Sequence, residues 1–216
     1  MNFLELCKRL HMEAGYQGAG PASVENQTGQ AARLVTWIAE AWRDIQNLRD
    51  DWEFMANEFS VSLLSGENAV LLPADAARVR KDTPVILTSG QRFYPTELEI
   101  AGMRALERNH TSANALPAYY AFNQVNHSLR VYPATDRDIT VNGEYFTQPQ
   151  MLLLNTDIPA LPERFHMLIV WGAMQYLSTF DEAGNQYQAA NAKYSELISE
   201  LTRSQLPVMT LAGPLA

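Results

Sequence analysis

The chain has 216 residues, of which 47% are hydrophobic and 19% charged, and its formal net charge is −8 at pH 7. This composition is typical of a globular protein, and the length suits one domain with an elaboration or two small domains. The single cysteine, Cys7, excludes a disulfide framework within the chain and a Cys-x-x-Cys metal pair. An acidic protein does not generally wrap nucleic acid, because it cannot neutralise the phosphates.

Neither a targeting segment nor a membrane span is expected. The first fifteen residues mix charges with apolar positions, which differs from the continuous apolar core of a signal peptide. No apolar run approaches the roughly 18 residues that a membrane span requires. We therefore expect no membrane partner.

Two helices are predicted before residue 56. Residues 2–14 place apolar side chains at helical spacing, and Gly15 is a stop signal. Residues 30–51 give the clearest helix, with Trp37 on the flank of a single apolar stripe. The stripe consists of Leu34, Ile38, Ala41, Trp42, Ile45, Leu48 and Trp52. We therefore interpret the tryptophans as packing residues rather than as a platform for a sugar or nucleotide.

The periodicity changes from helical to alternating after Trp52. Phe59, Val61 and Leu63 alternate with serines, which indicates a half-buried strand. A short apolar run follows at residues 69–73.

Two hairpins are then expected, with a short helix between them. Residues 84–95 predict the first hairpin and residues 118–133 the second, which is rich in the aromatic residues typical of strands. Thr96 is the candidate N-cap of the short helix between them. A further strand at residues 139–146 contains Gly143 as a candidate bulge.

Two more helices are predicted after a proline-marked loop. Pro162 suits the first turn of a helix that reaches Phe180 and is apolar almost all round, so we expect this helix to be central and buried. The last helix presents one stripe, formed by Tyr187, Ala190, Tyr194, Leu197, Ile198 and Leu201. The remaining residues, 205–216, are too apolar for a solvated tail and too irregular for a helix.

This order of elements predicts an α+β fold. Helices from both ends of the chain, residues 1–56 and 160–204, would form one discontinuous helical bundle. Residues 57–159 would form an inserted, antiparallel, β-rich lobe with a short helix. Residues 205–216 would form a C-terminal docking tail.

No motif for catalysis, cofactor binding or metal binding is found. The sequence lacks a Gly-x-Ser-x-Gly elbow, a Walker A loop and a His-Glu-x-x-His helix. Cys7 has no adjacent base and is interpreted as a buried residue of an amphipathic helix. The four histidines are scattered, and His166 is interpreted as a core or interface residue. We therefore predict no enzyme, no cofactor and no metal.

One group of carboxylates offers an alternative. Asp50, Asp51 and Glu53 lie near tryptophans, an association found in glycan-cleaving clefts. Adjacent residues on a helix point in different directions, so Asp50 and Asp51 would not face one substrate. A solvated helix end is the favoured interpretation, and a glycan-cleaving hydrolase is the alternative.

Three stretches resemble the head-to-tail connector (adaptor) proteins of tailed phages. Residues 28–55 contain Trp-Ile, Ala-Trp and Ile-Gln pairs and an acidic-Trp-x-Phe exit. Residues 128–152 are similar to the family's hydrophobic-Tyr-Pro strand and the Gly-Glu-Tyr strand that follows it. Residues 156–207 resemble its closing helix pair, with Pro-x-x-Phe-His at the start and Gln-Leu-Pro at the end.

The resemblance implies a structural protein of the virion neck, assembled in the host cytoplasm. Such adaptors form a ring, usually dodecameric, beneath the portal, and join the capsid vertex to the next connector, stopper or tail component. Genomic DNA passes through the lumen, and a net negative lining would repel it rather than bind a particular sequence. Another ring component, a stopper or a tail terminator, is the alternative within virion proteins.

The implied contacts fall on two sets of residues. The portal-docking tail would use Leu206, Pro207, Val208, Met209, Leu211 and Leu215. Packing within the bundle or between subunits would use Trp37, Trp42, Trp52, Phe165, Trp171, Tyr187 and Tyr194. Of these, Trp37 is the one expected to touch a neighbouring subunit.

Overall fold

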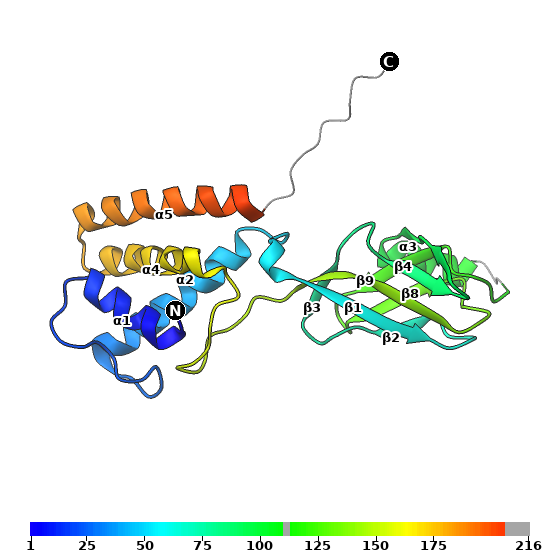
Figure 1. The fold of residues 1–216 in the computed structure, drawn as a ribbon, viewed down its shortest axis with the longest axis horizontal. Coiled ribbons are helices and arrows are strands. Elements are labelled where there is room, and N and C mark those ends of the chain that lie inside the picture. Colours follow the sequence, from blue (N-terminus) through cyan, green and yellow to red (C-terminus); the bar gives the residue numbers. More distant parts are fainter. Residues whose placement is uncertain (110–112, 206–216) are drawn as a thin grey trace, which may run out of the picture. The chain divides into compact units, whose positions relative to one another are not determined.

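A computed structural model describes residues 1–109 and 113–205 of the chain. The chain divides into two compact units (Figure 1). The helical unit comprises Met1–Phe54 and the chain from Pro149 onward, and the β unit comprises Met55–Gln148. The described residues combine helices with mostly antiparallel sheets, so the α+β class is confirmed.

The helical unit is organised around one buried helix. Its helices are α1 (Phe3–Glu13), α2 (Gly29–Asn47), α4 (His166–Phe180) and α5 (Gly184–Gln205), with a 3-10 turn, η2 (Glu163–Phe165), before α4. Helix α4 contacts α1, α2 and α5. This position follows from its composition, because a helix that is apolar on every side is stable only when other elements cover it.

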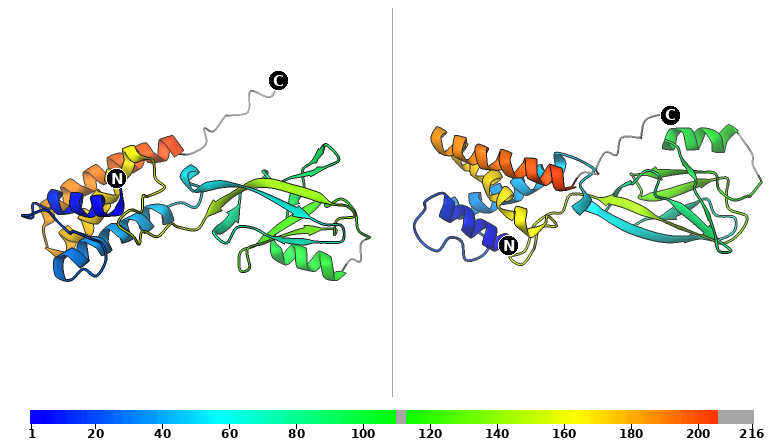
Figure 2. Two further views of the ribbon diagram at one scale, coloured as in Figure 1. Left: turned by 60° about the horizontal axis from the view of Figure 1, so that its bottom comes forward. Right: turned by 45° about the horizontal axis from the view of Figure 1, so that its top comes forward.

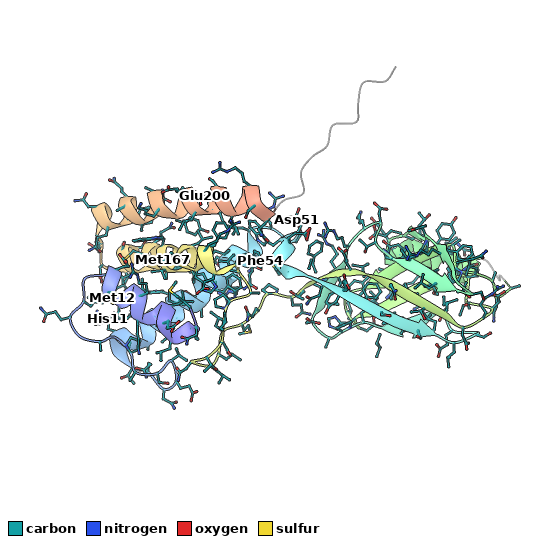
Figure 3. The ribbon with its side chains drawn as sticks, in the orientation of Figure 1. His11, Met12, Asp51, Phe54, Met167 and Glu200 are labelled. Carbon is teal, nitrogen blue, oxygen red and sulfur yellow. The ribbon has the colours of Figure 1, made fainter. Side chains whose placement is uncertain are left out.

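The C-terminal end of α2 differs from the prediction. The helix ends at Asn47, and Trp52 lies beyond it in the chain. Figure 3 labels its neighbours Asp51 and Phe54 in the segment that follows the helix. The Trp52 indole N–H donates to the carbonyl of Ile45 at 3.0 Å, and its ring stacks on Phe54 with the centroids 5.6 Å apart. The last four carbonyls of a helix lack intrahelical partners, so the indole satisfies one of them while its ring is buried. Helical spacing therefore predicted the burial of Trp52 for the wrong reason.

The β unit contains two sheets. The first has the order β1 (Ala56–Leu63), β9 (Ile139–Thr147), β4 (Val85–Thr88), β5 (Gln91–Phe93), and β3 (Ala76–Val79) also pairs with β9. The second has the order β2 (Ala69–Leu71), β8 (Ser128–Tyr132), β7 (Tyr119–Asn123), β6 (Thr96–Glu97). Helix α3 (Ile100–Asn109) contacts β7 and β8. Both sheets contribute side chains to one core, including Phe59, Leu129 and Val141.

Both predicted hairpins are confirmed, as β4–β5 and β7–β8, but two smaller predictions are wrong. Thr96 belongs to β6 and pairs with β7, so it does not cap α3. Gly143 is not a bulge, because β1 and β9 pair without interruption and Gly143 lies opposite Phe59. A Cβ at residue 143 would lie 2.7 Å from the Cζ of Phe59, so this glycine makes room for the aromatic ring.

Candidate interaction surfaces

The exposed large apolar side chains of the helical unit gather mainly in two places. One is a groove between α2, α4 and α5, and the other is the segment from residue 149 to residue 160. In the β unit, by contrast, the exposed large apolar side chains lie singly on different strands and turns. Contiguous exposed apolar surface is uncommon on monomers and marks interaction sites.

The groove has a volume of about 500 Å³. We call it the aromatic groove; its lining residues are Ala41, Asp44, Gly172, Gln175, Tyr176, Thr179, Phe180, Tyr187 and Tyr194. Tyr176, Phe180 and Tyr187 are each more than a third exposed. Such a concave surface with aromatic walls suits an apolar group from another chain.

Gly172 shapes the floor of the aromatic groove. A Cβ at this residue would lie 3.2 Å from the Cβ of Ala41 and 3.3 Å from the Cε2 of Tyr194. The glycine therefore allows α2 and α5 to approach α4 closely at one level.

Hydrogen bonds and ring contacts fix the walls of the groove. The Tyr176 hydroxyl donates to the Asp44 carboxylate, and this bond raises the pKa of Tyr176 to about 12. The Phe180 ring lies 5.8 Å from that of Trp37, between centroids, and the Arg33 guanidinium carbon lies 4.1 Å from its centroid. Such contacts hold an exposed aromatic side chain in one orientation.

Residues 149–160, which we call the apolar loop, expose four aliphatic side chains. Met151 is 74% exposed and Ile158 60%, and Leu153 and Leu154 are more than half exposed. The only charged residue in the loop is Asp157. Its carboxylate accepts the backbone N–H groups of Leu153 at 2.7 Å and Leu154 at 2.8 Å, which lowers the pKa of Asp157.

Further bonds tie the apolar loop to the body of the helical unit. The Gln150 N–H donates to Gln46 Oε1 at 2.7 Å, and Gln46 Nε2 donates back to the Gln150 carbonyl at 3.0 Å. Asn155 Oδ1 accepts the Val24 N–H at 2.7 Å, and the Phe3 N–H donates to the Asp157 carbonyl at 2.8 Å. The loop is therefore preorganised, although four of its apolar side chains face solvent.

The structure divides the predicted packing residues into three groups. Trp42, Trp52 and Phe165 are buried in the core of the helical unit. Trp37 and Trp171 are half-buried. Tyr187 and Tyr194 line the aromatic groove. The predicted apolar stripe of α5 includes both residues, but only Ala190 and Leu201 of this helix are fully buried.

The predicted docking tail and the apolar loop differ in how they relate to the structure. The predicted docking tail, Leu206, Pro207, Val208, Met209, Leu211 and Leu215, lies outside the described residues. The apolar loop was assigned no role from the sequence. The sequence feature that could have indicated this surface is the run Met151-Leu152-Leu153-Leu154. It lies between a strand and a helix, so its apolar residues do not form the buried face of a regular element.

The candidate catalytic groups are held in unreactive arrangements or in surface pairs. Burial raises the pKa of the Cys7 thiol to about 12, which keeps it protonated. His166 is buried, donates from Nε2 to the Leu161 carbonyl at 2.9 Å, and has a pKa lowered mainly by burial. Arg49 forms a surface ion pair with Asp51 at 2.9 Å. Within residues 1–109 and 113–205, no group of His, Cys, Asp and Glu side chains is arranged to hold a metal ion.

Among the helices of residues 1–109 and 113–205, none combines the length and the apolarity that crossing a membrane requires.

An apolar groove and a rigid apolar loop on one helical unit are typical of a subunit that associates with other chains. Comparison with protein families identifies the family of the chain. The SU10 adaptor protein family matches residues 1–214, so the chain belongs to this family of phage head–tail adaptors. Its members are structural proteins of the phage. No curated protein matches the chain.

Proposed function

We propose that the chain forms a ring beneath the portal and joins the capsid vertex to the tail, with genomic DNA passing through the lumen. The observation that carries this proposal is the family match over residues 1–214. Twelve copies is the number usual for the connector proteins that the sequence resembles. The acidic net charge of −8 suits a channel through which DNA slides without being held.

Two features of the helical unit support a role in assembly. A cyclic ring requires each subunit to present two different surfaces, one for each neighbour. The aromatic groove and the apolar loop are two such surfaces, formed by different residues on one core. The domain division proposed from the sequence puts the aromatic groove in the helical bundle and residues 149–159 of the apolar loop in the inserted lobe, and we propose that the strands of the lobe serve another partner.

The C-terminal residues are proposed to dock on the portal. Leu206, Val208 and Met209 belong to a stretch rich in apolar residues and prolines. A segment of this composition gives up chain entropy when it orders on a partner, and the buried apolar area compensates for this loss.

Assembly with the portal of the same phage tests the proposal. Purified full chain and purified portal are mixed, and the products are examined by negative-stain imaging and native mass spectrometry. We expect a ring of this protein on the portal. Replacing residues 206–216 with a glycine-serine segment of equal length should weaken docking, whereas the same segment appended after Ala216 should not.

The alternative ring components predict a different order of assembly. A stopper or a tail terminator would bind portal only after another component, so direct binding to bare portal favours the adaptor. A stable monomer that ignores the portal under all conditions would contradict the proposed function.

A further inference from the structure

We propose that the apolar loop of one copy inserts into the aromatic groove of the next copy around the ring. The inference rests on the proposed function, because it assigns the two surfaces through which neighbouring subunits meet. Each contact would be heterologous: residues 151–158 of one chain would meet α4 and α5 of another. Repetition of such a contact makes either a closed ring or an open filament, depending on the angle between the two surfaces.

The position of the two surfaces suits a regular repeat of the contact. Both belong to the helical unit, so a single core fixes the angle between them. The loop lies on the side of this unit away from α5, as Figure 1 and the right view of Figure 2 show. A subunit built in this way repeats the same rotation at every contact, even where other parts of the chain change position.

The chemistry of the two surfaces is complementary. The loop offers flexible aliphatic side chains, and the groove offers aromatic walls formed by Tyr176, Phe180 and Tyr187. Each surface has one carboxylate, and each carboxylate already accepts internal donors: Asp44 from the Tyr176 hydroxyl, and Asp157 from two backbone N–H groups. The contact would therefore cover two carboxylates that already have hydrogen-bond donors, which lowers the cost of removing them from water.

One polar group in the groove is also suited to an incoming backbone. The Gln175 side chain lines the groove, and its Nε2 is buried without a hydrogen-bond partner among the described residues. A buried donor without an acceptor is unfavourable. A carbonyl from an inserted loop would supply the acceptor, so the contact would include one specific hydrogen bond in addition to the buried apolar area.

The expected size of the contact favours a closed ring over a stable dimer of two copies. Four aliphatic side chains bury on the order of 400 Å² on one partner, at roughly 100 Å² each. Stable pairwise interfaces bury about 800 Å² per partner. One contact is therefore too weak for a lasting dimer, whereas a closed ring, in which every subunit makes two contacts, is held by all of them together.

Cysteine cross-linking of the full chain tests the arrangement. Ile158→Cys places a thiol on the loop and Thr179→Cys places one in the groove, and the double variant carries both. The native Cys7 is buried, so it does not react under these conditions. After assembly on portal and treatment with a short bismaleimide, we expect a denaturing gel to show a ladder of multimers. The matched control pairs Ile158→Cys with Val125→Cys, which lies in the β unit and is 92% exposed; it should give no ladder.

A second variant measures the apolar contribution. Leu154→Ser combined with Ile158→Ser should lower ring yield at least about tenfold, because each contact loses the burial of two aliphatic side chains. The control, Leu71→Ser, removes an even more exposed apolar side chain from the β unit and should leave the yield unchanged. Circular dichroism verifies that both variants are folded.

The outcomes separate the two claims. A ladder with the loop–groove pair and a loss of rings with the serine variant support the contact. Rings that form normally without a ladder, or a cross-link between two Ile158→Cys loops, overturn the contact and leave the proposed function intact. Absence of rings with the unmodified chain, with and without portal, overturns the proposed function itself.

Discussion

The helical unit and the β unit treat their apolar side chains differently. In the β unit, two sheets contribute to one core, and the exposed large apolar residues lie on different strands and turns. In the helical unit, α4 is covered by three helices, but a groove beside it and a loop of four aliphatic side chains stay exposed. Scattered exposure requires no explanation, whereas contiguous exposure on a rigid frame indicates a partner. The β unit thus buries its own apolar surface, and the helical unit has apolar surface left for association.

The largest expected effect is on the core of the helical unit. Trp52→Ala should lower the free energy of unfolding by about 3–5 kcal/mol, because it removes a buried indole and its hydrogen bond to Ile45. Chemical denaturation measures the loss, and hydrogen exchange should locate it in the helical unit. Trp37→Ala, at a half-buried position, is the control and should cost less than half as much. Equal effects would show that the two tryptophans are equally important for the core.

A smaller effect is expected in the β unit. Gly143→Ala should destabilise the protein by about 1–3 kcal/mol, since the new methyl group would collide with the ring of Phe59. The double variant Gly143→Ala, Phe59→Leu should recover part of the loss, and thermal denaturation measures both. Ring assembly should be retained at temperatures where the variant is folded. No recovery in the double variant would mean that residue 143 requires glycine for another reason.

The next effect concerns the order of the apolar loop and its dependence on pH. The pKa of Asp157 is lowered in the folded state by two backbone N–H donors. The carboxylate therefore stabilises the loop at pH values above its unfolded pKa, and this contribution is lost as pH falls through the folded pKa. Asp157→Asn should expose the amides of Leu153 and Leu154 to faster hydrogen exchange at neutral pH. In the variant, the protection of these two amides should no longer decrease at acidic pH, because no carboxylate remains to be protonated.

The smallest effect is expected at the carboxylates that follow α2. Asp51→Asn and Glu53→Gln change surface side chains, so stability and ring assembly should match those of the unmodified chain within error. A polysaccharide-cleavage assay with both variants tests the hydrolase alternative. Activity in the unmodified chain that disappears in these variants would support an enzyme.

The sequence was most informative where a single pattern determines the structure. Alternation at Phe59 and Leu63 predicted β1, and the apolar character of residues 166–180 predicted a central helix. Both hairpins followed from strand patterns on either side of a turn. The order of several packing patterns along the chain was enough to indicate the phage adaptor family. These features depend on residues that are close in the sequence, so they can be predicted without knowledge of the tertiary contacts.

Other features depend on residues that are distant in the sequence. Trp52 is buried beyond the end of α2, where its indole N–H donates to the carbonyl of Ile45. Gly143 is needed because the ring of Phe59 lies opposite it. The exposure of the apolar loop is the clearest example. The sequence assigned it no role, and its bonds to Gln46, Val24 and Phe3 hold the backbone on the surface of the helical unit. The sequence by itself determined most of the elements and the family, and only the tertiary structure decided which apolar residues remained exposed, because exposure depends on the whole set of neighbours.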